Sequence, residues 1–447
     1  MLNKVKRLVT YLQAYGLQSA LNRARNYGLG TAFHQIASRW EMTTIHERAL
    51  TSLPAIEAPI SGGPIAGDAV CYLDETLTGS SYAEAPGGTM PDRLFVLHLE
   101  QAQVFPASVL TRPLAGPPPG PLPHNLRYGS GNLILTQADD MLAESLTHRI
   151  VVPDRLTLLS PGSWRASLPK SRLREDRPHV LLDLCSAHFG HALLDTPARL
   201  WALAQPDLLP APPLNYVGFR MQGLGKAPAR WPGFLHEILS ALGIDPGTIW
   251  FPDRAVQFRS LYIPRRVSPF GPGGIGLPYF RTMRRIGDRI VQKSVVPPDA
   301  PPGPNRVYLS RRRLRNDPRR LLDAGEDRLE ALFAARGFAI VHPQDHALSD
   351  QIRMIRAADL VAGTVGSQLH LTVFCDRPDV RLFRIVPSFF NYDIDQKIMD
   401  GVAGALQTHV VPSQPRKGAS QSESSWRIDG AEFDRIARAV DDWLAQT

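Results

Sequence analysis

The sequence predicts an α/β protein of two lobes, each built around a parallel sheet, with a cleft between them. Its 447 residues exceed the size at which a single hydrophobic core stops growing. Strand-like and helix-like segments alternate through the second half, which is typical of a doubly wound parallel sheet. A proline-rich run at 295–304 precedes that half, and such a run suits a linker because proline continues neither a helix nor a central strand.

Residues 1–50 predict an N-terminal amphipathic helical segment. Within residues 1–28, apolar side chains recur at helical spacing among basic ones: Leu2, Val5, Leu8, Leu12 and Tyr15. This helix could pack on the body of the protein or lie on an anionic membrane surface. It lacks the apolar stretch of a signal peptide, and we expect no membrane-spanning segment. Residues 51–92 are rich in Gly, Ser, Pro and Ala, and predict a loop-rich connection.

Residues 93–294 predict the first α/β lobe, with strands at 93–100, 132–136 and 177–185. The last strand runs directly into residues 185–201, which read CSAHFGHALLDTPARLW. On a helix the polar residues of this segment would share one face: His188, His191, Asp195 and Arg199. A strand followed at once by a helix places this polar stripe at the carboxyl edge of the sheet, where ligands bind in open α/β folds.

Residues 305–412 predict the second α/β lobe. Strands are expected at 305–310, 338–343, 359–363 and 379–387, and helices at 317–337, 349–358 and 367–375, with Ser349 as an N-cap. The terminal segment 425–446 contains an amphipathic helix at 430–446.

The charge and cysteine content narrow the function classes. The net charge is +8, and 43 of the 50 basic residues are arginine, so either a codon bias or an anionic partner such as phosphate explains the excess. No interleaving of basic and aromatic residues points to nucleic acid. The three cysteines lie far apart, which disfavours a disulfide scaffold or a zinc finger.

Two segments of the second lobe predict an anion site. The first strand ends in SRRRLRN, residues 310–316, and the third ends in GTVGSQLH, residues 363–370. A glycine turn before a helix presents backbone N–H groups and a positive dipole end to an anion. Arginines at the same edge of a parallel sheet would complete a clamp for a diphosphate.

Taken together, residues 177–390 resemble the family 61 glycosyltransferases, a group often labelled capsular polysaccharide biosynthesis proteins. The resemblance rests on the order and spacing of several motifs: HFGHALLDTPARLW at 188–201, Tyr308, Ser310 and Arg311, then Arg313, Asn316 and Asp317, then Gly337 and Phe338, then Asp350 and Gln351, and the turn at 363–371.

The turn departs from the family pattern. Val365 stands where the family has a histidine, Ser367 replaces an alanine, Leu371 replaces an asparagine, and His370 occupies a position where a small polar residue is usual. Gly363 and Gly366 are retained. The departures leave the identity of the nucleotide sugar open.

The resemblance implies a GT-B-like enzyme with two Rossmann-like lobes. It would be an inverting hexosyl- or pentosyltransferase of a capsule-type pathway in a bacterium, moving a sugar from a nucleotide-sugar donor to a hydroxyl of a polysaccharide or glycoconjugate. It implies no cofactor and no resident metal. The expected location is cytoplasmic, at the inner membrane surface if residues 1–28 bind it. The donor side of the site would hold Arg311, Arg313, Asn316, Gln351, Gly363, Gly366, Ser367 and His370.

The polar stripe would supply the catalytic base, since a carboxylate four residues on can orient and charge an imidazole. We favour His191 as the base with Asp195 behind it and His188 as an acceptor contact. Asp195 as the base itself is the close alternative. The same residues could instead be a helix cap and an Asp195–Arg199 pair, or they could hold a metal in a hydrolase. A non-catalytic glycan- or nucleotide-binding protein with a decayed site is the third class.

Some weaker candidates remain. Segments 230–239 and 391–396 could face the cleft, although each is more often an ordinary loop. Trp164, Trp231 and Trp250 could stack on a sugar, but core packing is the default for tryptophan.

Overall fold

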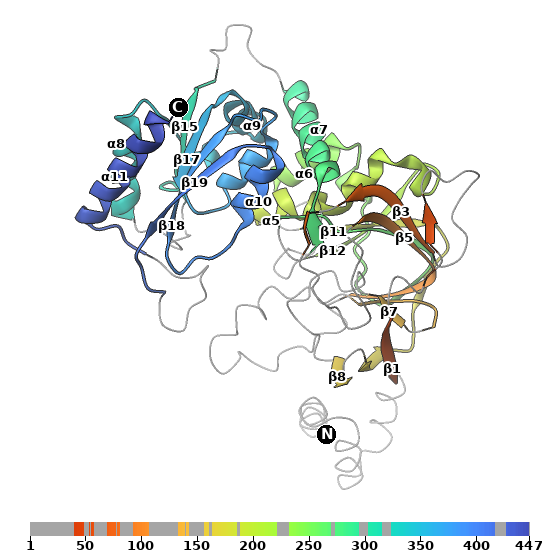
Figure 1. The fold of residues 1–447 in the computed structure, drawn as a ribbon. Coiled ribbons are helices and arrows are strands. Elements are labelled where there is room, and N and C mark those ends of the chain that lie inside the picture. The colour runs from red at the N-terminus through yellow and green to blue at the C-terminus, as the bar shows by residue number, and fades with distance from the viewer. Residues whose placement is uncertain are drawn as a thin grey trace, which may run out of the picture.

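The computed structural model describes residues 40–48, 53, 55–57, 69–76, 78–80, 93–106, 133–138, 140–142, 156–160, 163–185, 188–220, 232–269, 273–294, 303–314, 323–415 and 426–446. Two large sheets organise these residues, and we call the units around them the N-terminal and C-terminal lobes (Figure 1). The predicted helix within residues 1–28 and most of the predicted linker lie outside the described residues. The prediction of a helical segment over 1–50 is wrong at its end, because β1 (Trp40–Arg48) is a strand that pairs with β9.

The N-terminal lobe contains a 12-stranded mixed sheet, with the order β12-β11-β13-β5-β6-β7-β1-β9-β8 along its main path. β4 and β14 form a separate small sheet. The strands of this lobe are β1 (Trp40–Arg48), β2 (Ala55–Glu57), β3 (Ala69–Thr76), β4 (Thr78–Ser80), β5 (Arg93–Phe105), β6 (Leu133–Leu135), β7 (Asp140–Leu142), β8 (Leu156–Ser160), β9 (Ser163–Pro169), β10 (Leu173–Glu175), β11 (His179–Cys185), β12 (Asn215–Arg220), β13 (Val256–Pro264) and β14 (Gly273–Ile275).

This sheet corrects the prediction of a parallel N-terminal lobe. The expected parallel pairing is present where β11 lies between β12 and β13, and in three short pairs, β1–β7, β2–β3 and β10–β13. β5 runs antiparallel to β13, β3 and β6. Antiparallel neighbours need no crossover helix, so this half lacks the strand–helix alternation that marks a parallel sheet. The prediction that 51–92 is loop-rich is also wrong in part, because β3 pairs with β5 and buries Cys71 and Leu73.

Helical segments lie along one side of the N-terminal lobe (Figure 1). They are α5 (Phe189–Leu194), the 3₁₀ segments η3 (Thr196–Ala204), η4 (Pro206–Leu208) and η6 (Pro246–Thr248), and the helices α6 (Gly233–Ala241) and α7 (Leu277–Lys293). Of these, α5, α6 and α7 are the ones next to the C-terminal lobe (Figure 1). α7 was not predicted from the sequence. Its buried face includes Tyr279, Met283 and Ile286.

The C-terminal lobe confirms the predicted parallel sheet. Its five strands have the order β16-β15-β17-β18-β19, and all four pairings are parallel. The strands are β15 (Arg306–Leu309), β16 (Ala339–Val341), β17 (Leu360–Thr364), β18 (Arg381–Pro387) and β19 (Ala405–Val411). The last strand was not predicted. It lies at the edge of the sheet and buries only one residue, Val411, which explains the weak signal.

Helices cover both faces of this sheet. α8 (Asp323–Ala334) and α11 (Gly430–Ala445) lie on the outer face, and α9 (Leu348–Ala357), η8 (Leu369–Phe374) and α10 (Ile394–Gly401) lie on the face toward the N-terminal lobe (Figure 1). A short 3₁₀ segment, η7 (Pro343–Asp345), follows β16. The terminal helix α11 is confirmed, and it packs Phe433, Ile436, Val440 and Trp443 into the outer core.

Two local predictions in this lobe are wrong. α9 begins at Leu348 after the extended residue Ala347, so Ser349 lies within the first turn and is not the N-cap. The helix expected at 367–375 is the six-residue 3₁₀ segment η8, in which Leu369, His370 and Leu371 donate their N–H groups three residues back. These three N–H groups are therefore not available to an anion, and a six-residue 3₁₀ segment offers a weaker dipole than the α-helix that was expected.

One hydrophobic cluster runs through both lobes. It joins Leu193 of α5 and Met283 of α7 to Ile352 of α9, Leu369 of η8 and Ile398 of α10. The lobes therefore share a core along this boundary, whereas the sequence predicted a cleft there. Among the described residues, no helix is both long enough and apolar enough to span a membrane.

Candidate active site

The polar stripe begins where β11 ends and α5 starts. His188 is the extended residue before the helix and makes no capping bond with its side chain. His188 is exposed, and its ring lies 5.2 Å from the His191 ring, centroid to centroid. The His191 side chain is 27% exposed, so it is open to a ligand, whereas Asp195 is fully buried. One face of the stripe thus joins an accessible imidazole to a buried carboxylate.

The predicted His191–Asp195 pairing is present. His191 Nδ1 lies 2.6 Å from Asp195 Oδ2. The other carboxylate oxygen, Oδ1, accepts from Ser268 Oγ at 2.9 Å and forms a buried ion pair with Arg266. Because both oxygens are engaged, the carboxylate has a fixed direction and holds the imidazole by one nitrogen. This arrangement suits proton transfer at the other ring nitrogen, Nε2.

Sequence reasoning missed Arg266 and Ser268. They follow β13, whose carboxyl end lies at the same sheet edge as that of β11 because the two strands are parallel. Arg199 was expected beside Asp195, and it is buried with a bond to the Pro264 carbonyl at the end of β13. The segment IPRRVS at 263–268 carried a readable signal: two arginines and a serine directly after a buried strand.

The arrangement also bears on the metal hypothesis. An arginine on Asp195 Oδ1 supplies the positive charge that a metal ion would otherwise bring, so the carboxylate is a poor ligand here. Within the described residues, no three His, Cys, Asp or Glu side chains gather as a metal site requires.

Arg311 and the glycine turn meet at the carboxyl edge of the C-terminal sheet. Arg311 Nη1 donates to the Val365 carbonyl at 3.1 Å. A Cβ added to Gly366 would lie 2.8 Å from the same Nη1, so a larger residue would push the guanidinium from its present position. The Val365 N–H is used by the Ile385 carbonyl of β18. The predicted convergence of arginine and turn is therefore present for Arg311.

Glu326 of α8, which sequence reasoning missed, anchors this edge. Its Oε1 accepts from the Tyr308 hydroxyl at 3.0 Å and from the Arg311 N–H at 3.1 Å, and its Oε2 lies 3.4 Å from Thr364 Oγ1. Burial raises the pKa of this carboxyl, and the neighbouring donors oppose that shift only in part. Glu326 therefore positions both strand ends from behind. The residues before it that resemble the family motif, Asn316 among them, lie outside the described residues.

The other predicted donor-side residues have partners of their own. Arg313 is exposed and pairs with Asp345 at 2.6 Å, away from the turn. Gln351 Nε2 donates to the carbonyls of Pro343 and His346, at 2.8 and 2.9 Å. Gly363 lies inside β17, where a Cβ would come within 3.0 Å of the Leu309 carbonyl. The structure does not bring the Arg313 and Gln351 side chains to Arg311, and the contact of all three residues with substrate stays a prediction.

The two predicted sites come together across the boundary between the lobes. A Cβ added to Gly190 of α5 would lie 2.6 Å from Ser367 Oγ and 3.0 Å from His370 Nδ1. Gly190 is the residue before His191, so the helix with the His–Asp pair packs directly on the glycine turn. The stripe and the turn therefore lie against each other, although Gly190 and Ser367 are 177 residues apart in the sequence.

A second histidine–carboxylate set lies on the C-terminal side of this contact. His370 Nε2 is 3.9 Å from Asp395 Oδ1, and Arg384 Nη1 donates to Asp395 Oδ2 at 3.1 Å. His370 is 8% exposed and Asp395 only 3%. The segment 391–396, a weak candidate in the sequence, thus contributes Asp395 to the contact. Trp250 packs against Phe258 and His179, as expected for a tryptophan that packs in the core.

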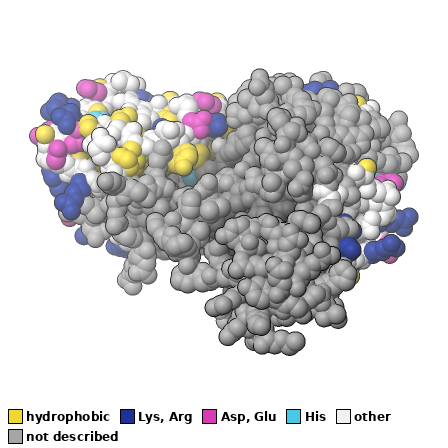
Figure 2. Space-filling model, turned by 90° about the horizontal axis from the view of Figure 1, so that it is seen from below, with side chains coloured by type: hydrophobic (Ala, Val, Ile, Leu, Met, Phe, Trp, Pro, Cys, Tyr) yellow, Lys and Arg dark blue, Asp and Glu magenta, His cyan; other side chains and the backbone are white. Residues whose placement is uncertain are grey.

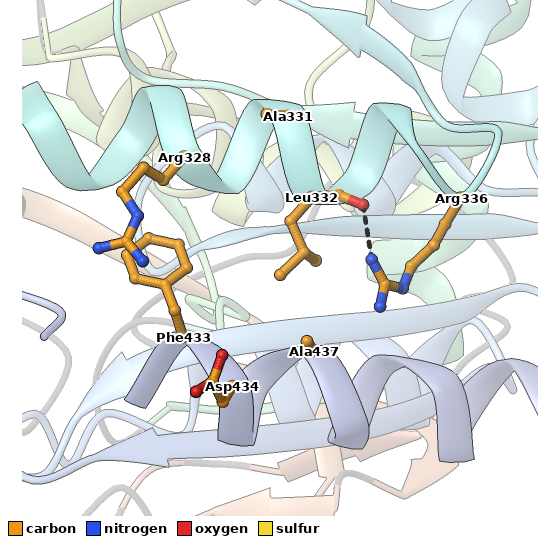
Figure 3. Close-up of a pocket in the computed structure, with 7 residues that line it drawn as sticks. All are labelled: Arg328, Ala331, Leu332, Arg336, Phe433, Asp434 and Ala437. Carbon is orange, nitrogen blue, oxygen red and sulfur yellow. Dashed lines mark hydrogen bonds between the residues drawn. The ribbon is translucent and has the colours of Figure 1, made fainter. Parts of the chain in front are cut away.

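An open groove of about 430 Å³ lies elsewhere, between α8 and α11 on the outer side of the C-terminal lobe (Figures 1 and 3). Arg328 stacks over the Phe433 ring at 3.7 Å, and Arg336 pairs with Asp441. None of the predicted site residues lines this groove. Figure 2 shows basic and acidic side chains interspersed over the described surface of the same lobe, so on this face the arginines form no single positive patch.

The comparison with known families agrees with this geometry. Residues 189–381 match the family model described as Glycosyltransferase 61, and the match begins at the first residue of α5 and ends at the start of β18. It therefore spans both halves of the site. None of the curated proteins matches this chain.

Proposed function

We propose that this chain, which belongs to glycosyltransferase family 61 through residues 189–381, is an inverting hexosyl- or pentosyltransferase with a nucleotide-sugar donor. The acceptor is a hydroxyl of a polysaccharide or glycoconjugate. The donor binds at the carboxyl edge of the C-terminal sheet and the acceptor faces it from α5, in a GT-B-like manner. The observation that carries the proposal is the contact of Gly190 with Ser367 and His370, which places the His191–Asp195 pair beside the anion site.

His191 is the base of this mechanism. With Nδ1 held 2.6 Å from Asp195, the proton on that nitrogen points to the carboxylate and Nε2 has the lone pair. Nε2 takes the proton of the acceptor hydroxyl while the oxygen attacks the anomeric carbon. The bond from that carbon to the diphosphate oxygen breaks, and its electron pair leaves with the nucleoside diphosphate. Attack opposite the leaving group inverts the anomeric configuration, and a positioned base contributes about 10²–10⁴-fold.

Arg311 stabilises the departing charge. Its guanidinium is held against the turn by the Val365 carbonyl, and Glu326 holds the N–H of the same residue. A cation fixed before the reaction stabilises developing negative charge without reorganisation at the moment of transfer. Asp195 and its partners Arg266 and Ser268 form an internally neutralised set on the acceptor side.

Paired variants test this division of labour. Arg311→Ala should weaken the binding of nucleoside diphosphates by about 1.5–3 kcal/mol in calorimetry, the range for one charge-assisted hydrogen bond. His191→Ala should abolish sugar transfer and leave that affinity intact. Arg254→Ala is the matched control, because Arg254 is an exposed arginine paired only with its exposed neighbour Asp253 in the described structure. Unchanged binding in Arg311→Ala would show that the diphosphate lies elsewhere.

Chelation separates the transferase from the metal-dependent hydrolase. Transfer should survive a chelator, and elemental analysis should find no stoichiometric zinc. About one zinc per chain, lost in His191→Ala, would overturn the transferase mechanism. For the biological setting we propose a capsule-type glycan in a bacterium and a cytoplasmic location at the membrane surface. Fractionation of the native cell would test the location.

A further inference from the structure

Two aromatic side chains lie at the sheet edge that carries the glycine turn. Phe390 and Tyr392 follow β18, and their rings meet edge to face with centroids 4.9 Å apart. The Tyr392 side chain is 46% exposed, which makes it one of the few large apolar-bodied side chains on the described surface. Neither residue has a role in the mechanism above.

The chain places this pair next to the anion site. β18 is the parallel neighbour of β17, and the Val365 N–H of the turn donates to the Ile385 carbonyl at 2.9 Å. β18 ends at Pro387. Residues 388–393, which we call the aromatic loop, therefore leave the same edge of the sheet a few residues beyond the Val365–Ile385 bond. On its far side the loop leads into α10, where Asp395 lies 3.9 Å from His370.

Hydrogen bonds hold the loop in place. Arg384 Nη1 lies 3.4 Å from the Tyr392 carbonyl and 3.1 Å from Asp395, so one guanidinium anchors both the aromatic loop and the partner of His370. Ser388 and Ser413 exchange two bonds, at 2.9 and 3.0 Å, which tie the start of the loop to the chain after β19. A half-exposed ring on an anchored loop loses little conformational freedom when a ligand stacks on it.

We propose that Tyr392, supported edge-on by Phe390, stacks on the nucleobase of the nucleotide-sugar donor. The inference rests on the proposed function and extends it to the nucleoside end of the donor. Arg311 and the turn recognise the diphosphate only, whereas an aromatic face recognises the base by its π surface. Stacking tolerates different bases, so Tyr392 supplies affinity for a nucleoside rather than the choice among nucleosides.

The test compares nucleotides with a probe that has no base. Binding of UDP, GDP, ADP and inorganic pyrophosphate is measured by calorimetry on the full chain. Tyr392→Ala should weaken the best-bound nucleotide by about 5- to 150-fold, the range for one base–aromatic stack, and leave the pyrophosphate affinity unchanged. Tyr392→Phe should bind like the wild type. Val410→Ala, at a 52% exposed apolar residue of the same lobe, is the control.

The outcomes separate the two proposals. If Tyr392→Ala weakens pyrophosphate as much as the nucleotide, the residue maintains the loop and does not stack on a base. If nucleotide affinity is unchanged but the Michaelis constant for the acceptor rises, the ring binds the acceptor and the inference is wrong. If the wild type binds pyrophosphate, and binds none of the nucleotides more tightly than pyrophosphate, the stacking role of Tyr392 is wrong while the anion site at Arg311 is supported. If the wild type binds none of the four probes, both the proposed function and the stacking role of Tyr392 are refuted.

Discussion

Gly190→Ala should separate the two halves of the site. The added Cβ would lie 2.6 Å from Ser367 Oγ and 3.0 Å from both Ser367 Cβ and His370 Nδ1. Rotation of the serine removes the first contact only. Ordinary carbon contacts are about 3.5–4.0 Å, so α5 must move by about 0.5–1 Å from the turn. Such overpacking costs about 1–3 kcal/mol of stability.

A displacement of this size also reaches the chemistry, because His191 is the next residue along the helix. A misplacement of about 1 Å can cost about 10²-fold in rate. We therefore expect kcat/KM for transfer to fall about 10- to 100-fold and Tm to fall with it. The matched control is Gly233→Ala, at the first residue of α6, where a Cβ meets nothing within 4 Å.

A double variant makes the prediction specific. Ser367→Gly removes both serine atoms that the new methyl would touch, so Gly190→Ala should cost less stability in that background, measured as the shift in Tm. The difference between the two backgrounds is the coupling between α5 and the turn. Two results would contradict the proposed site: Gly190→Ala matches Gly233→Ala in both Tm and rate, or its effects are the same in both backgrounds. In either case α5 does not pack on the turn.

Three further predictions follow from burial and charge. Asp195→Asn should lower turnover by about tenfold or more and leave nucleoside-diphosphate affinity unchanged, since the lost charge lies behind His191 on the acceptor side; near-native turnover would remove the pair from catalysis. The raised pKa of Glu326 means that the folded chain keeps this proton to higher pH than the unfolded chain, whose value is near 4.5, so stability is lost as pH rises through that window. Glu326→Gln should accordingly gain stability relative to the wild type in urea unfolding as pH rises above 4.5, and a difference independent of pH would contradict this. Burial raises the pKa of Cys375 to about 12, so an aromatic disulfide reagent at about pH 8 should label this thiol only after unfolding, and labelling of Cys375 in the native protein would contradict its burial.

The C-terminal sheet could be predicted because each of its inner strands is an apolar run between turn signals. Residues 305–310 and 379–387 match β15 and β18 to within two residues at each end. β19 has no such run, since it lies at the edge of the sheet and buries only Val411. In the N-terminal lobe, the large sheet is built mainly from antiparallel pairs between distant segments, and the pattern along the chain does not say which strand finds which partner.

The candidate site divides in the same way. The His191–Asp195 bond was predictable because residues four apart on a helix are neighbours. Arg266, which neutralises the carboxylate, comes from 71 residues further along the chain, and only the adjacency of β11 and β13 brings it there. Glu326 lies 15 residues after Arg311 and reaches it only because α8 packs on the outer face of the sheet. Local spacing therefore identified the reacting groups, whereas the groups that hold them depend on tertiary contacts.

Glycines along the boundary between the lobes show why the expected cleft is a packed interface. Gly287 lies in the middle of α7, where glycine costs about 1 kcal/mol relative to alanine. A Cβ there would lie 2.7 Å from Arg356 Nη2 and 3.1 Å from the Phe374 ring, both of the C-terminal lobe. A Cβ on Gly401 of α10 would overlap the Phe280 ring of α7. With Gly190, three close contacts between the lobes depend on a glycine. The sequence shows the glycine within α7, but the side chains that require it belong to the other lobe. The close packing between the lobes therefore could not be predicted from the sequence.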